Sequence, residues 1–252
     1  MMKMLADLHN DLARIFTTRL NTSHAFTLVC SVFLPTLLLA FRSIEDLDYG
    51  IHLATGRWIL ENWRVPTTDP FSWATREHSY VAYHWGFQVL LAVVYHLCDH
   101  LGAVLLRFFI IAATALVLFR ALCFRGVPAL LGASVALLTL IACEWRFSVR
   151  PELFSILLLA TAISVSDRWR AGNVRAIWLL VPITLIWVNT HIYILGAIVL
   201  LAHLFESLVY KRQLKSILIC TTACAVVCFI NPYGLDAVLE PLRLVTRLGK
   251  GN

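Results

Sequence analysis

Long apolar stretches alternate with short polar segments along most of the chain, and arginine, lysine, glycine or proline ends most of these stretches. Apolar residues fall on every face of the stretches when they are drawn as helices, whereas a soluble bundle would keep one face of each helix polar. Runs of roughly 15 to 20 apolar residues are typical of transmembrane helices. The pattern therefore predicts an all-α fold, a polytopic transmembrane helix bundle of about seven or eight spans. The apolar runs are 25–41, 87–97, 103–122, 128–143, 153–165, 177–188, 194–208 and 216–230.

The short run 87–97 decides the predicted topology, because His96 and Asp99 break it. If the run spans the membrane and the amino terminus lies inside, the basic loops 168–175 and 211–215 fall outside, contrary to the positive-inside rule. If the run enters and leaves on one side, or lies partly in the membrane plane, both loops face the cytoplasm. We favour this second arrangement, and eight full spans are the alternative.

The chain divides into three predicted parts. Residues 1–23 place apolar side chains on one side of a helix and polar ones on the other, which is typical of a helix lying on the cytoplasmic membrane surface. Residues 24–234 form the transmembrane module, whose first external loop, 42–86, contains interfacial helices. Residues 235–252 form a C-terminal segment.

Composition supports the membrane class. The chain is 60% hydrophobic and 14% charged, with a mean hydropathy of +0.77, which excludes an ordinary soluble globular domain. The net charge of +6 is small and lies in short loops, so it indicates topogenic bias and no nucleic-acid partner. Cys220, Cys224 and Cys228 recur every four residues on one helix face, where packing is the expected role.

The external loop concentrates groups that are costly to hold near hydrocarbon. Asp46 and Asp48 form an Asp-x-Asp pair at the outer end of the first run. Such a pair can hold a divalent cation, or one carboxylate can act as a base beside a phosphate-bearing substrate. The structural alternative is that Asp48 caps the helix that follows it. His52 lies four residues beyond Asp48, on the same helix face, from which it can hydrogen-bond that carboxylate.

A second polar cluster precedes the run 153–165 and falls on the same predicted side. Arg150 can bind a phosphate, and Glu152 either pairs with it or favours the positive start of the helix. Arg146 adds a second cation nearby. A purely topogenic arginine would be expected on the inside, so this cluster is a functional candidate.

Three further candidate groups lie at the predicted outer interface. His84 opens the run 87–97, and Asn189 and His191 separate two runs that are joined by almost no loop. Asn231 and Tyr233 belong to an Asn-Pro-Tyr-Gly sequence, for which a turn is the structural alternative.

Six segments carry a family resemblance, and in chain order they are D-L-D-Y-G-I-H-L-A-T-G-R-W-I-L, P-T-T-D-P-F-S-W, Y-H-W-G-F-Q, V-R-P-E-L-F-S, W-V-N-T-H and N-P-Y-G. Together with the first apolar run, they resemble bacterial members of the GT-C superfamily of membrane glycosyltransferases, which use polyprenyl-phosphate-linked sugars. The resemblance covers nearly the whole chain. It implies a GT-C-like fold in the bacterial inner membrane, with a cytoplasmic amino terminus.

The resemblance also implies a reaction, the inverting transfer of a sugar from a polyprenyl-phosphate donor to an acceptor at the outer face. The catalytic acid of the family maps to Asp46 or Asp48, and the cations for the lipid phosphate map to Arg146 and Arg150. Asp46 and Asp48 are also the candidate ligands of a divalent cation. The candidate substrate-binding residues are His52, His84, Arg146, Arg150, Glu152, Asn189, His191, Asn231 and Tyr233.

The chain departs from the resemblance in length, because family members usually carry further spans. It corresponds to the amino-terminal module alone, either a fragment or a subunit whose membrane partner completes the site. The alternative function is a non-catalytic GT-C-like subunit that binds a lipid-linked glycan or scaffolds a membrane complex. A small transporter is a third reading. It is disfavoured because no ionisable residue falls in the middle of an apolar run, apart from Arg107 and His203 near the edges of theirs.

Overall fold

The computed structural model describes residues 26, 32–75, 77–211 and 213–248, and within these residues the chain forms helices and no β-strand. The expected all-α fold is therefore confirmed. The predicted amphipathic segment 1–23 lies outside the described residues. The elements are α3 (Leu34–Ala40), α4 (Leu47–Asn62), α5 (Trp85–Phe124), α6 (Ala129–Ala142), η2 (Glu144–Arg146), α7 (Glu152–Arg170), η3 (Ala176–Leu179), α8 (Leu180–Thr190), α9 (Ile194–Tyr210), α10 (Leu214–Val227) and α11 (Leu235–Leu248).

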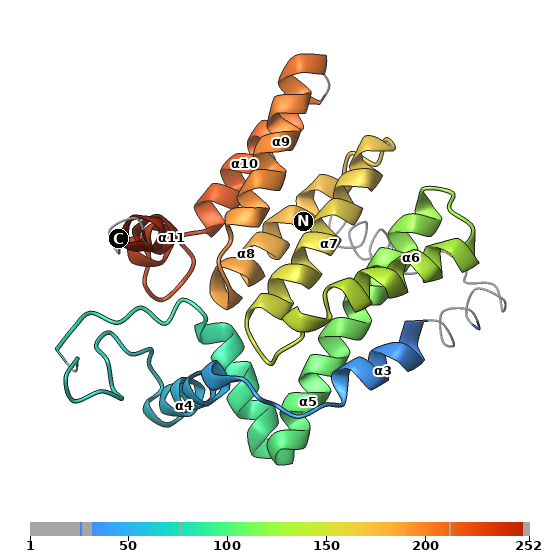
Figure 1. Ribbon diagram of the computed structural model, residues 1–252. Helices are drawn as coiled ribbons and strands as arrows, with labels where there is room; N and C mark the ends of the chain where they lie inside the picture. Colours follow the sequence, from blue (N-terminus) through green and yellow to red (C-terminus); the bar gives the residue numbers. More distant parts are fainter. Residues whose placement is uncertain (1–25, 27–31, 76, 212, 249–252) are drawn as a thin grey trace.

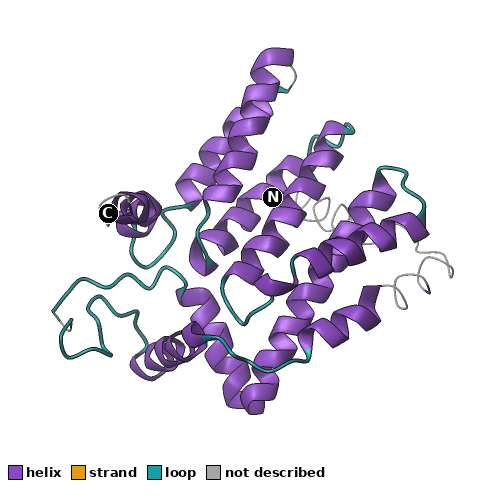
Figure 2. Cartoon of the chain, viewed as in Figure 1, coloured by secondary structure: helices purple, strands orange, loops and turns teal. Residues whose placement is uncertain are grey.

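The helices form one bundle with a polar cap at one end. Helices α7 to α10 pack against one another, and α5 packs against α3, α4, α6 and α7 (Figure 1). Helix α4 and the irregular loop 63–84 lie at the end where α5 begins, as Figure 2 shows. An isolated antiparallel bridge joins Thr68 to Ser79 within this loop. The predicted external loop is therefore a structured cap built on α4.

Helix α5 reverses direction partway along its length. The backbone leaves the helical region at Cys98 (φ −142°, ψ 22°) and Asp99 (φ 49°, ψ −141°), so two helices meet at a sharp kink. A Cβ atom on Gly102 would lie 2.0 Å from the Val94 carbonyl oxygen, so only glycine lets the two arms approach this closely. The predicted run 87–97 thus belongs to a short arm that turns back before the next run begins.

Helix length by itself supports one membrane crossing. Among the described residues, Trp85–Phe124 is the one helix that is both long and apolar enough to cross a membrane. After the reversal, residues 100–124 continue as a helix of about 37 Å, which matches a bilayer. Four other apolar helical segments are 10–17 residues long, so their lengths do not establish the expected seven or eight spans.

Side chains are distributed inside-out on α6. Its buried positions include the small residues Gly132, Ala133 and Ala136, whereas Leu130 and Leu138 are 69% and 64% exposed. In a soluble protein the large apolar residues would be the buried ones. Small residues at helix contacts and large apolar residues outside are typical of helices that pack in lipid.

Helices α9 and α10 show related patterns. On α9, His203 and Ser207 are buried while Phe205 is 69% exposed. On α10, the Cys220 and Cys224 side chains are buried, and the Cys220 thiol donates to the Ile177 carbonyl oxygen at 3.3 Å. The packing role that was predicted for the cysteine face is therefore confirmed.

Two contacts fix the elements that carry the site. Arg107, which is 1% exposed, donates to the carbonyl oxygens of Ala40 and Arg42 and so caps the end of α3. A Cβ atom on Gly56 would lie 1.9 Å from the Gln88 carbonyl oxygen, so α4 touches the α5 backbone directly. Helix α4 is therefore held at a fixed position against the short arm of α5.

Candidate functional site

Asp46 begins α4 and fixes the geometry of the Asp-x-Asp pair. Its backbone is extended (φ −87°, ψ 122°), and its Oδ1 atom accepts a hydrogen bond from the Asp48 amide at 2.9 Å. This is the geometry of a helix N-cap. The alternative that Asp48 caps the helix is wrong, because Asp46 is the cap and Asp48 lies in the first turn.

Arg150 joins the two carboxylates from the segment that precedes α7. Its guanidinium donates from Nε to Asp46 Oδ2 and from an Nη atom to Asp46 Oδ1 at 2.7 Å, which is a bidentate pair. The same group lies 3.1 Å from Asp48 Oδ2. Residues more than a hundred positions apart are thus brought together at the same end of the fold, and the partner of Arg150 is Asp46 where Glu152 was expected.

The two carboxylates have different environments. The Asp46 side chain is 2% exposed and the Asp48 side chain is 56% exposed. Burial alone would raise the pKa of Asp46, but the hydrogen bonds from Arg150 and from the Asp48 amide outweigh it and lower that pKa. Asp46 is therefore a buried anchor, and Asp48 is the carboxylate that a solute can reach.

The arrangement does not favour the divalent cation. No group of three or more histidine, cysteine, aspartate or glutamate side chains in the described part of the chain is arranged to hold a metal ion. Arg150 already lies against both Asp46 and Asp48, so a cation would compete with its guanidinium. The candidate metal site at this pair therefore stays a prediction, in which the cation would have to displace the guanidinium of Arg150.

Three histidines from separate elements meet beside this pair. The rings of His52 and His84 are 5.4 Å apart in an edge-to-face arrangement, and those of His84 and His191 are stacked at 5.1 Å. The expected hydrogen bond from His52 to Asp48 is absent among the described contacts, since His52 Nδ1 instead lies 3.2 Å from Gln88 Nε2. The cluster confirms that these three candidates share one end of the fold.

Sequence reasoning missed the residues that orient this cluster. Ser155 Oγ lies 2.6 Å from His191 Nδ1 and accepts from Trp187 Nε1 at 2.8 Å. Gln88 plays the corresponding role for His52. All three partners sit within apolar runs, and an isolated polar residue at a buried helix position is the signal that could have found Gln88 and Ser155.

Burial lowers the pKa of every histidine in the cluster. The pKa of His191 falls to about 4, and burial with the neighbouring His191 and His52 rings lowers that of His84 well below its usual value. Burial is also the main reason that the pKa of His52 is lowered, and the negative charges of Asp48 and Asp46 partly oppose this shift. The cluster is therefore neutral at pH 7.

This neutrality predicts acid sensitivity. Between pH 6.5 and about 4 the unfolded chain binds a proton at His191 that the folded chain does not. The free energy of unfolding should therefore fall as the pH drops through this window, by up to about 3 kcal/mol from His191 alone. Unfolding in detergent, followed by circular dichroism at several pH values, measures the slope. A His191→Gln variant with an unchanged slope would contradict the assignment.

Other ion pairs surround the site, and a polar cavity opens beside it. Arg146 pairs with Glu152 at 3.2 Å and stacks on the Trp145 ring at 3.9 Å, and Arg42 pairs with Glu144. A cavity of about 340 Å³ borders Asp46 and does not include Asp48. Its lining comprises Arg42, Ser43, Ile44, Glu45, Asp46, Arg107, Glu144, Trp145, Ser148 and Val149.

The remaining candidate residues make structural contacts around the cap that α4 and the loop 63–84 form. Asn189 accepts from Trp85 Nε1 at 2.8 Å and donates to the Ile230 carbonyl oxygen at 3.0 Å. Asn231 Oδ1 accepts from the Tyr233 amide at 2.8 Å, which is the turn that was given as its alternative role. The Tyr233 hydroxyl donates to a carbonyl oxygen of the loop 63–84. These contacts are structural, so Asn189, Asn231 and Tyr233 are positioned to support the site from outside it.

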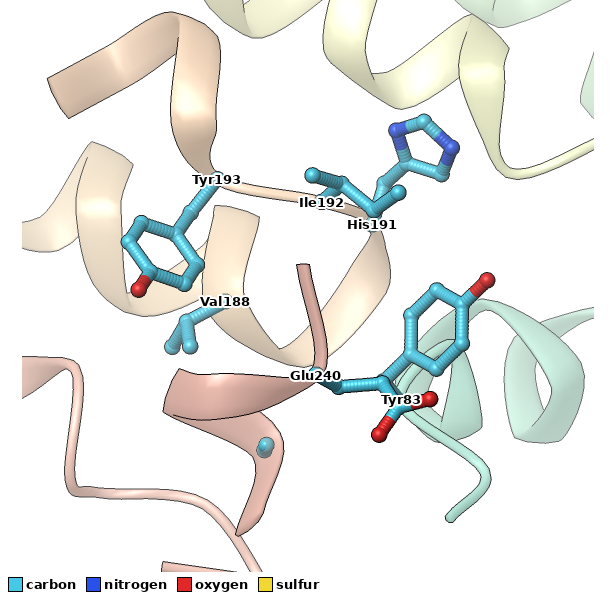
Figure 3. A pocket seen from close by; sticks show the side chains of 7 residues that line it. Tyr83, Val188, His191, Ile192, Tyr193 and Glu240 are labelled. Carbon is cyan, nitrogen blue, oxygen red and sulfur yellow. The ribbon is translucent and has the colours of Figure 1, made fainter. Parts of the chain in front are cut away.

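The space on the other side of His191 is too small for a substrate. Figure 3 shows the His191 ring turned away from the side chains of Tyr83 and Glu240, which lie next to each other. The pocket between them has a volume of about 20 Å³, enough for roughly one water molecule. This pocket is therefore not a candidate substrate site.

Comparison with known proteins finds no matching family model, no matching curated protein and no matching solved structure.

Proposed function

We propose that the protein is a multi-pass protein of a bacterial inner membrane, with a cytoplasmic amino terminus and the Asp48 site on the outer face. The exposed large apolar side chains of α6 and α9 support this, because lipid is the solvent that tolerates them. Two ion pairs, Arg125–Asp167 and Arg170–Glu206, lie at helix ends whose order along the chain places them opposite the Asp48 site. In this arrangement seven helical segments cross, and the short arm of α5 stays at the outer side.

Cysteine labelling tests this topology. In a Cys98→Ser background, a membrane-impermeant maleimide added to intact cells should label Ser79→Cys and should leave Ala171→Cys unlabelled until the cells are opened. Both positions are exposed, so accessibility in the folded chain is matched. The background without added cysteine sets the baseline. Labelling of Ala171→Cys from outside would contradict the arrangement.

Within this membrane setting, the proposed activity is transfer of a sugar from a polyprenyl-phosphate donor to a hydroxyl acceptor. The observation that carries it is an exposed carboxylate, Asp48, held 3.1 Å from the guanidinium of Arg150 at the outer end of the bundle. A base and a phosphate-binding cation side by side are what such a transfer needs.

The proposed step is an inverting displacement at the anomeric carbon of the donor sugar. The Asp48 carboxylate takes the proton of the acceptor hydroxyl, and the acceptor oxygen forms a bond to the anomeric carbon of the sugar. The bond from that carbon to the phosphate oxygen breaks, and polyprenyl phosphate leaves with the electron pair. Arg150 and Arg146 stabilise the leaving phosphate. Because the histidine cluster beside these arginines is neutral, it does not attract the phosphate away from them.

The direct experiment is transfer by the purified protein in lipid. A short-chain polyprenyl-phosphate donor that carries a radiolabelled sugar is incubated with hydroxyl acceptors found at the outer face of the inner membrane. The labelled product is measured with time. Product formation that depends on the protein is the expected result. If the donor binds but is not consumed, the transferase proposal is wrong and the non-catalytic subunit remains.

The second candidate function is a non-catalytic membrane subunit that binds a lipid-linked glycan or scaffolds a complex. One observation favours it, because the cations at the site are already paired: Arg150 with Asp46, Arg146 with Glu152 and Arg42 with Glu144. In the catalytic proposal the donor phosphate must displace or share these pairs. In the subunit proposal a partner chain completes the site.

A further inference from the structure

We propose that the opposite end of the bundle carries a second binding site, which takes a small neutral polyol such as a sugar or a glycerol moiety. The site is a cavity of about 330 Å³ at the ends of α7 and α9 and the start of α10. This volume is at the lower limit of the roughly 300–1,000 Å³ that small-molecule sites occupy. It is lined by Trp169, Arg170, Glu206, Ser207, Tyr210 and Gln213.

Three of the lining residues have buried polar atoms without a partner. Trp169 Nε1, Ser207 Oγ and Gln213 Oε1 make no hydrogen bond within the described residues. Trp169 and Ser207 are 4% and 1% exposed, so bulk water does not readily compensate them. Buried polar atoms are rarely left unpaired, and three on residues that line one cavity point to a ligand that pairs with them.

The chemistry of these atoms selects hydroxyl groups. An indole N–H only donates, an amide oxygen only accepts, and a serine hydroxyl does both. A ligand at this place must therefore offer acceptors and donors within a short distance. Adjacent hydroxyl groups provide both, because each hydroxyl can donate and accept a hydrogen bond. An ionised carboxylate or phosphate would lack the donor for Gln213.

The charges in the cavity favour a neutral ligand. Arg170 donates from Nε to Glu206 Oε2 at 2.9 Å and from an Nη atom to the same oxygen at 2.5 Å. His203 Nδ1 lies 3.4 Å from that oxygen as well. Because Arg170 is already paired with Glu206, the charged side chains among the described lining residues compensate each other and do not select an anion or an amine. The aromatic rings of Trp169 and Tyr210 supply apolar surface for the C–H faces of a sugar.

Two sources can supply this chemistry, a free polyol or the headgroup of a lipid. The experiment therefore has two arms, both with the protein in phosphatidylcholine nanodiscs. Equilibrium dialysis with radiolabelled glucose measures the free polyol. A photoreactive alkyl glucoside in the same nanodiscs measures the headgroup, with crosslinked peptides of α7 and α9 identified by mass spectrometry. A photoreactive alkyl phosphocholine is the control for chain binding.

Trp169→Phe is the deciding variant, since it removes the N–H donor and keeps the ring. We expect it to weaken glucoside binding about five- to tenfold, the effect of one hydrogen bond to a neutral group. Trp178→Phe is the matched control, because Trp178 is 39% exposed and does not line the cavity. Ser207→Ala should give a comparable loss and replaces Trp169→Phe if that variant misfolds.

The outcomes are distinct. Binding of glucose identifies a free polyol, and binding of the glucoside alone identifies a lipid headgroup. The site is overturned if neither probe binds, if the phosphocholine probe labels the same peptides equally, or if the Trp169 and Ser207 variants bind as wild type does. None of these measurements depends on sugar transfer at the other end, so its failure leaves this test unaffected.

Discussion

Asp48→Asn is expected to slow sugar transfer by about 100- to 10,000-fold, the contribution of a general base. The variant removes the proton acceptor but keeps the size and polarity of the side chain. Its exposed contact with Arg150 contributes only about 0–1 kcal/mol, so the free energy of unfolding should hardly change. Initial rates of transfer and thermal unfolding of the same preparation measure both quantities.

Asp46→Asn is the matched control for this prediction, because it makes the same chemical change two residues away. An asparagine still caps the helix, yet its amide nitrogen would face one of the Arg150 donors in a nearly buried position. We expect a loss of stability of about 1–3 kcal/mol and a smaller loss of activity than in Asp48→Asn. The assignment of the base is wrong if Asp48→Asn retains near-normal transfer.

Arg150→Ala is expected to weaken binding of a short-chain polyprenyl-phosphate sugar by about tenfold or more, because a charge-assisted contact to phosphate is lost. The variant also leaves the carboxylate of Asp46 without its cation. Arg150→Lys keeps the charge but not the planar fork, so its affinity should lie between those of wild type and Arg150→Ala. Donor binding to the purified proteins is the measurement.

Loss of stability must be separated from loss of the phosphate contact. Arg125→Ala provides the control, since Arg125 makes a similar bidentate pair with Asp167 at 2.7 and 2.8 Å at the other end of the bundle. It should lose a comparable ion pair without changing donor affinity. Equal affinities in wild type, Arg150→Ala and Arg150→Lys would remove Arg150 from the donor site and favour the structural ion pair.

The parts of the fold that follow from local chemistry were predictable. Apolar runs located the helices from α5 to α10, because helix formation in such runs depends on residues close in sequence. The turn at Asn231 followed from its side chain and the proline after it. Placing charged groups at one end of the membrane predicted that Arg150 lies on the same side as Asp46 and Asp48, but it did not predict their ion pair, since Glu152 was the expected partner.

The features that escaped prediction depend on tertiary contacts. The topology argument favoured a reversal at the run 87–97, but the residues of the kink, Cys98 and Asp99, were not predicted because neither is a glycine or a proline. Which carboxylate becomes buried is set by the guanidinium of Arg150, which arrives from far along the chain. The partner of His52 is Gln88 for the same reason, since α4 meets α5 only in the folded bundle.

Asp48 cannot shift along the surface of α5 by itself. At Gly56 the α4 backbone rests against the Gln88 carbonyl oxygen, and a slide of one residue would drive a side chain into that oxygen. Helix α4 and the short arm of α5 therefore act mechanically as one lever that carries the exposed carboxylate.

This lever joins the rest of the bundle at Cys98 and Asp99, where the helix is interrupted. At the start of the short arm Trp85 Nε1 donates to Asn189 of α8 at 2.8 Å, and at the start of α4 the Asp46 carboxylate is paired with Arg150. Any movement of this lever about residues 98–99 would break both contacts, so the position of Asp48 depends on the hydrogen bond at Trp85 as well as on the ion pair at Asp46.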